Sequence, residues 1–143
     1  MQRINYFFED TPEQPALTNI QVSGWIQSII DSYQSEIEEI NYIYCSDNYL
    51  LKVNQEYLDH DYYTDIITFD NREDRDEPVE ADIFISLDRV QDNATEMNVS
   101  FEDELHRVMI HGIHHLLGQG DKTDTEKAEM RKREEASLSL RQF

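Results

Sequence analysis

The sequence predicts an α+β fold, a mixed sheet of about four strands packed with about five helices, in a single domain over residues 1–143. Residues 79–88 alternate apolar and polar side chains, which is typical of a strand with one buried face. Residues 19–35 instead carry apolar side chains at helical spacing, among them Trp25 and Ile29. Because 143 residues suit one sizeable core, we expect both kinds of element to share it.

The first half of the chain gives each element its own signal. Aromatic and β-branched residues predict a strand over 2–8, and the helix over 19–35 follows a loop. Residues 39–45 alternate in the manner of a second strand. Ser46 is suited to cap the N-terminus of a helix over 47–58. The apolar stripe of that helix comprises Leu50, Val53 and Tyr57.

The second half begins with two further strands, predicted over 62–70 and 79–88. The charged, proline-ended segment 71–78 between them has little capacity to pack, so we expect it only to connect the strands. A short helix follows near 88–97.

A long helix is predicted over 101–118, where Ser100 and Asp103 resemble a capping box at its start. Gly118 is expected to end this helix. An amphipathic helix over 124–138 completes the chain.

Composition and charge narrow the possible functions. The formal net charge of −19 repels phosphate at long range, so a nucleic-acid contact needs local positive charge. The single Cys45 provides no thiolate cluster, and a metal would therefore need His and carboxylate ligands. The sequence contains no signal-peptide pattern and no apolar run of membrane-spanning length, from which we expect a cytoplasmic protein.

A pattern suited to metal binding spans the end of the long helix. His111 and His115 are four residues apart, so both imidazoles can face one ion. Gly118 can turn the chain back in a left-handed conformation, which brings Asp121 to the same side as a third ligand. Two histidines and a carboxylate form a catalytic zinc set, and also the ligand set of non-haem iron oxygenases. Of these two metals Zn²⁺ is favoured, because the pattern of ligands on a helix is typical of hydrolytic zinc sites.

The spacing is that of the metzincin motif H-E-x-x-H-x-x-G-x-x-H, with two substitutions. Gly112 stands where those peptidases carry the glutamate that activates water, which disfavours a zinc peptidase. Asp121 stands where the third histidine would be. His114 is out of this register, so we expect it to be partly buried or bound to a backbone carbonyl. His60 and His106 are expected to be structural.

Three blocks of the sequence occur together in one known family. "HGIHHLLGQGD" at 111–121 is similar to H-G-x-L-H-L-x-G-Y-D-H. "VNQEYLDHDYYTDIITFD" at 53–70 is similar to an Asn-containing helix that leads into T-D/N-V-L-S-F-P, and "ADIFIS" at 81–86 to G-D-I-x-I-S. On these blocks the chain resembles the YbeY family of single-strand-specific, metal-dependent endoribonucleases, which are bacterial rRNA maturation factors.

This resemblance implies a zincin-like fold and an enzyme that processes the 3′ end of 16S rRNA and acts in ribosome quality control. It implies one Zn²⁺, or another divalent metal, held by His111, His115 and Asp121. It also brings the strand with Thr64 and Asp65 near the metal, as candidates for a general base that the sequence does not otherwise identify. The implied partners are single-stranded RNA and the small ribosomal subunit or its assembly factors, without DNA or a membrane.

Positive charge near the metal is distributed differently from the family pattern. Leu58 stands where the family usually carries an arginine that contacts RNA phosphate. Six of the 12 basic residues instead follow Asp121. They are Lys122, Lys127, Arg131, Lys132, Arg133 and Arg141. This basic cluster is either an RNA-facing edge or a salt-bridged helix exposed to solvent. The second hypothesis for the chain is therefore a non-catalytic ribosome-assembly factor with a structural zinc site.

The register of the metal ligands can be tested by two single substitutions. His115→Ala should abolish stoichiometric zinc binding, because it removes a predicted ligand, whereas His114→Ala should leave the metal content unchanged. The measurement is metal analysis of the purified variants. Loss of metal from His114→Ala would show that the register is wrong.

Overall fold

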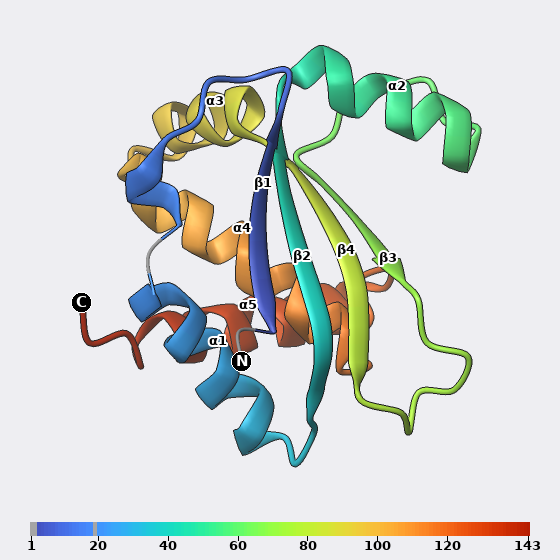
Figure 1. Cartoon of the computed structure of the whole chain (residues 1–143). Coiled ribbons are helices and arrows are strands. Elements are labelled where there is room, and N and C mark those ends of the chain that lie inside the picture. Colours follow the sequence, from blue (N-terminus) through green and yellow to red (C-terminus); the bar gives the residue numbers. More distant parts are fainter. Residues whose placement is uncertain (1–2, 19) are drawn as a thin grey trace.

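The computed structural model describes residues 3–18 and 20–143, and its centre is a four-stranded mixed sheet (Figure 1). Its strands are β1 (Ile4–Glu9), β2 (Ile37–Cys45), β3 (Ile66–Asp70) and β4 (Val79–Ser86). They lie in the order β1-β2-β4-β3, in which β1 is parallel to β2, β2 is parallel to β4, and β3 is antiparallel to β4. The predicted α+β fold with a mixed sheet is confirmed.

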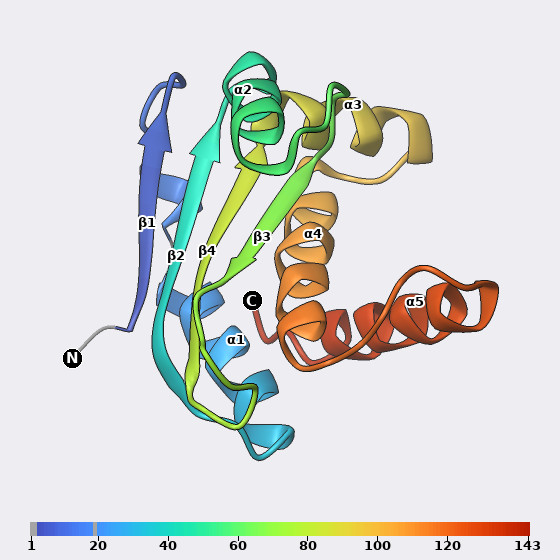
Figure 2. The same ribbon diagram turned by 90° about the vertical axis from the view of Figure 1, so that its right-hand side faces the viewer.

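Five α-helices surround this sheet, and a short 3-10 helix over Pro15–Leu17 precedes them. They are α1 (Ile20–Ser32), α2 (Asp47–Leu58), α3 (Leu87–Met97), α4 (Phe101–Leu116) and α5 (Asp124–Leu138). α1 and α4 share the main core with one face of the sheet, and α5 packs on α4 farther from the strands (Figure 2). α2 lies at the other face, over a smaller apolar cluster. No helix in the described ranges is long and apolar enough to cross a membrane.

The predicted helix ends depend on local rules, and the structure confirms them. The Ser46 hydroxyl accepts a hydrogen bond from the Tyr49 amide at the start of α2, and the Ser100 hydroxyl caps α4 in the same way. The Asp103 carboxylate, predicted to complete a capping box with Ser100, pairs with Arg141 instead. α4 ends at Leu116, and Gly118 has a φ of 98°, a conformation that L side chains rarely adopt. The chain therefore turns back directly after the histidines.

Several details of the prediction are wrong. Tyr57 is 70% exposed, because α2 covers the sheet only with the residues near Leu50 and Val53. The third strand begins at Ile66 rather than at residue 62, because the Asn54 amide binds the Tyr62 carbonyl and holds residues 62–65 as a loop. Residues 2 and 19, which the predicted first strand and first helix include, lie outside the described residues.

The charged segment 71–78 also does more than connect two strands. The Arg72 side chain is only 4% exposed; it pairs with Asp70 and donates to the Leu116 carbonyl across 2.7 Å. This bond satisfies one of the free carbonyls at the C-terminus of α4. It thereby ties the end of β3 to the helix that carries the histidines.

The closest approach of α4 to the sheet occurs at Gly112. A Cβ atom at this position would lie 3.1 Å from both the Ile66 Cδ1 and the Thr68 Oγ1 atoms of β3. It would also lie 3.6 Å from Ile83 of β4. Gly112 therefore faces the sheet, where a glutamate side chain of the peptidase type has no room.

Gly112→Leu should destabilise the protein by about 1–3 kcal/mol, because the new side chain overpacks the contact between α4 and β3. The matched control is Gly24→Leu in α1, where an added Cβ meets nothing within 4 Å and stability should be unchanged or slightly raised. Urea unfolding of both variants measures the difference. Equal stabilities would show that α4 does not pack closely on β3.

Candidate active site

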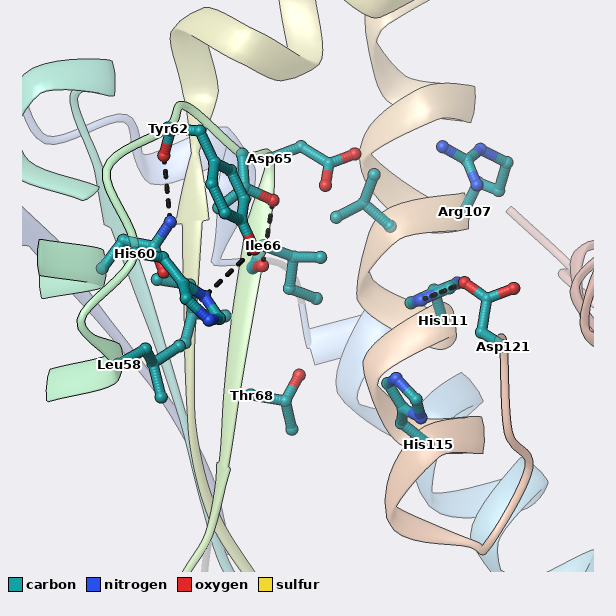
Figure 3. Close-up of a pocket in the computed structure, with 14 residues that line it drawn as sticks. Leu58, His60, Tyr62, Asp65, Ile66, Thr68, Arg107, His111, His115 and Asp121 are labelled. Atoms are coloured by element: carbon teal, nitrogen blue, oxygen red, sulfur yellow. Dashed lines mark hydrogen bonds and ion pairs between the residues drawn. The ribbon is translucent and has the colours of Figure 1, made fainter. Parts of the chain in front are cut away.

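A cavity of about 590 Å³ opens between α4, β3 and the loop that follows α2 (Figure 3). His111, His115 and Asp121 line one wall. Leu58, His60 and Tyr62 line the facing wall, as Figure 3 shows. The base candidates Thr64 and Asp65 also line it, so the cavity brings together every residue predicted as a ligand or a base.

Three side chains on the α4 side have the donor atoms for a metal. The Nε2 atom of His111 lies 3.7 Å from the Oδ2 atom of Asp121. Two ligands of one tetrahedral zinc ion are about 3.4 Å apart, so this pair is close to ligand spacing. The His111 and His115 rings have centroids 5.4 Å apart. Within the described residues no three His, Cys, Asp or Glu side chains are already gathered around one metal position, so binding by all three requires an adjustment of side chains.

Hydrogen bonds orient both imidazoles toward the cavity. The Nδ1 atom of His115 lies 3.0 Å from the Gln119 carbonyl oxygen, which only accepts, so Nδ1 carries the proton and Nε2 keeps its lone pair. The Nδ1 atom of His111 lies 2.6 Å from a carboxylate oxygen of Glu134 in α5. A histidine held in this way through one nitrogen is typical of metal ligands that bind through the other. The donor set therefore fits a divalent metal.

Glu134 belongs to a buried charge network that the sequence analysis missed. Its side chain pairs with Arg107 across 3.1 Å, and Arg107 pairs with Glu104 across 2.6 Å. Burial opposes ionisation of Glu134, but its hydrogen bond to His111 and the charge of Arg107 hold its pKa below the usual value. Glu104, Arg107 and His111 follow one another at spacings of three and four residues. This spacing places them on one helix face, so the sequence alone indicates a polar face on this helix.

The two candidates for the general base, Asp65 and Thr64, have different surroundings and hydrogen-bond partners. Burial raises the pKa of the Asp65 carboxyl, although the charges of Arg107 and His111 oppose the rise. The Asn93 amide donates to this carboxyl across 3.3 Å. The Thr64 hydroxyl donates to the Ile66 carbonyl across 3.4 Å. Asp65 is thus the more basic of the two candidates, and the assignment of a general base remains a prediction.

The remaining histidines occupy three different environments. His114 is completely buried, so the expectation of partial burial is wrong, and its Nε2 atom bonds to the Ser137 hydroxyl across 2.8 Å. Burial lowers the pKa of His114 to about 4. His106 is also buried and accepts a hydrogen bond from Arg141, as expected of a structural residue. His60 instead lines the cavity.

The basic cluster does not form one edge beside the cavity. Arg133 lies over the ring of Tyr33, and Arg141 pairs with Asp103 at the other end of α4. None of its six members is among the described residues that line the cavity. RNA binding by Lys122, Lys127, Arg131 and Lys132 therefore stays a prediction without support from cavity geometry.

Two oriented imidazoles on a helix and a carboxylate from the loop that follows it, beside a mixed sheet, are typical of metal-dependent hydrolases. The family model "Endoribonuclease YbeY" matches residues 8–141. The proteins of that name from Cytophaga hutchinsonii and Porphyromonas gingivalis are 50% and 46% identical to this chain. The first match covers 96% of each chain, and the second covers 99% of this chain and 92% of the relative.

The solution structure of TM1509 from Thermotoga maritima has a similar fold, with a TM-score of 0.69 and 26% sequence identity. The match covers 95% of this chain and 87% of that one. The chain therefore belongs to the YbeY family of endoribonucleases, enzymes that hydrolyse phosphodiester bonds within RNA. The resemblance inferred from the sequence blocks, the enzyme class and the fold are confirmed.

Glu134→Gln should weaken zinc binding about 10- to 100-fold, because it removes the carboxylate that orients His111. Glu135→Gln is the matched control, since Glu135 is exposed on the same helix and should leave the affinity unchanged. Competition against a zinc chelator measures both affinities. An unchanged affinity in Glu134→Gln would show that Glu134 does not support a metal ligand.

Proposed function

We propose that this chain is a zinc-dependent, single-strand-specific endoribonuclease that matures the 3′ end of 16S rRNA and acts in ribosome quality control. The observation that carries the proposal is the orientation of the His111 and His115 imidazoles toward one cavity, with Asp121 3.7 Å from His111, in a chain of the YbeY family. Residues 1–143 act as a single domain in this proposal.

His111, His115 and Asp121 are the proposed zinc ligands. A bound Zn²⁺ supplies a water of lowered pKa and polarises a phosphoryl oxygen. Glu134 and the Gln119 carbonyl hold the two imidazoles, so the site is oriented before the substrate arrives. A carboxylate at Asp121, rather than a third histidine, lowers the net charge of the site.

Asp65 is the proposed acceptor of the proton from the attacking water. It lies in the same cavity as the ligands, and its raised pKa makes it a stronger base than an exposed aspartate. Thr64 is the weaker candidate, since its hydroxyl donates to the Ile66 carbonyl. Lys122, directly after Asp121, is the proposed first contact of the basic cluster with the RNA backbone.

The proposed partners are single-stranded RNA and the small ribosomal subunit or its assembly factors, in the cytoplasm, without DNA or a membrane. The net charge of −19 supports a selective interaction, because a chain this acidic is repelled from most nucleic-acid surfaces.

A non-catalytic assembly factor with a structural zinc site is the second candidate. Two observations favour it: Leu58 lines the cavity in place of the family arginine, and Arg107 is neutralised by Glu104 and Glu134. A zinc peptidase is not favoured, because Gly112 faces β3 so closely that a glutamate side chain has no room there.

Zinc-loaded protein should cleave a single-stranded RNA oligonucleotide and leave the same sequence in a duplex intact. His111→Ala should lose both zinc and cleavage, because it removes a ligand and its link to Glu134. Gel analysis of end-labelled RNA, with metal analysis of each sample, makes the measurement. Zinc binding without cleavage would support the assembly factor, and cleavage that survives in metal-free His111→Ala would contradict the proposed site.

A further inference from the structure

The cavity wall opposite the proposed ligands carries two aromatic rings in contact. The His60 and Tyr62 rings have centroids 5.2 Å apart and planes inclined by only 22° (Figure 3). The Tyr62 hydroxyl and the Nδ1 atom of His60 are 3.0 Å apart, which joins the rings edgewise as well. Tyr62 is 55% exposed and His60 is also exposed. Because the rings are stacked on each other, the pair offers a preformed outer ring face to a molecule in the cavity.

A buried residue fixes this pair in place. The Asn54 side chain, 1% exposed, donates to the Tyr62 carbonyl across 2.9 Å. The Asn54 backbone carbonyl accepts from the amide of His60 across 3.1 Å. Asp59, which lies between Asn54 and His60 in the sequence, has a left-handed φ of 55° that turns the chain after α2. Since Asn54 holds the backbone of both residues and the two side chains bond to each other, little conformational entropy remains to be lost when a ligand binds.

The charges of the cavity indicate which part of a nucleotide fits each wall. Arg107 is the only lysine or arginine among the described residues that line the cavity, and Glu104 and Glu134 neutralise it. Asp59 and Asp61 flank His60 in the sequence. This wall therefore repels a phosphate group, which fits instead at the metal ligands. A nucleobase has a flat, uncharged face, and aromatic side chains bind such faces by stacking.

We propose that His60 and Tyr62 form a stacking platform for one unpaired nucleobase, next to the phosphate that the metal site takes. The proposal rests on the proposed endoribonuclease function and deepens it. A base in a duplex is paired and stacked on both faces, so only a strand that can turn a base out reaches the platform. The platform thus gives a structural reason for cleavage of single strands.

The test uses zinc-loaded protein and single-stranded RNA oligonucleotides that carry 2-aminopurine at successive positions. Stacking quenches the fluorescence of 2-aminopurine, and stopped-flow mixing records the change before cleavage. The variants are His60→Ala, Tyr62→Ala and Tyr62→Phe. Tyr63→Ala is the matched control, because Tyr63 is a neighbouring tyrosine, 49% exposed, that contacts Asn48 and Arg89 and does not line the cavity.

Tyr62→Ala and His60→Ala should each raise KM for single-stranded RNA about 5- to 100-fold with little change in kcat, and should remove the quenching. Tyr62→Phe should keep both the quenching and the KM within about threefold of the unmodified protein, because the ring remains. Unchanged KM and quenching in the two alanine variants would overturn the platform while leaving the endoribonuclease intact. Quenching without cleavage in the unmodified protein would support the platform and contradict the proposed activity.

Discussion

The site depends on the close packing of α4 against β3 at Gly112. With no side chain at this position, the helix approaches β3 until an added Cβ would lie 3.1 Å from Ile66 and Thr68. The neighbouring residues on the helix then project to either side of this contact line. His111 and His115 consequently face the cavity beside β3, whereas His114 turns into the core against α5.

A second constraint comes from the buried charges that fasten α5 to α4. Glu104 and Glu134 are 1% and 4% exposed, and either would be costly to bury without a partner. Arg107 pairs with both, and His111 takes the remaining oxygen of Glu134. The role of this network does not depend on a net gain in the free energy of unfolding. It fixes the rotation of one proposed ligand through contacts between two helices.

The features that the sequence predicts correctly follow from local rules. Helical periodicity places His111 and His115 on one face, and a glycine with φ of 98° at position 118 returns the chain toward them. The sequence blocks also identify the family, which the comparisons confirm. The limits of the strands and helices are reproduced to within a few residues, apart from the start of β3.

The missed features depend on contacts between distant segments. The role of Glu134 follows from the packing of α5 on α4, and α5 buries only Met130, Glu134 and Ser137. His60 enters the cavity because Asn54 directs the loop after α2. Arg72 is buried because a free carbonyl at the end of α4 lies within its reach. No periodicity in the sequence encodes these pairings.

The most direct test of the central claim is X-ray absorption at the zinc edge of the metal-loaded protein. A site formed by His111, His115 and Asp121 predicts two imidazole nitrogens at about 2.0–2.1 Å, oxygen ligands from a carboxylate and water, and no sulfur. Substituting Asp121→His should raise the imidazole count from two to three. A spectrum with fewer than two imidazoles, or one that Asp121→His leaves unchanged, would contradict the proposed metal site.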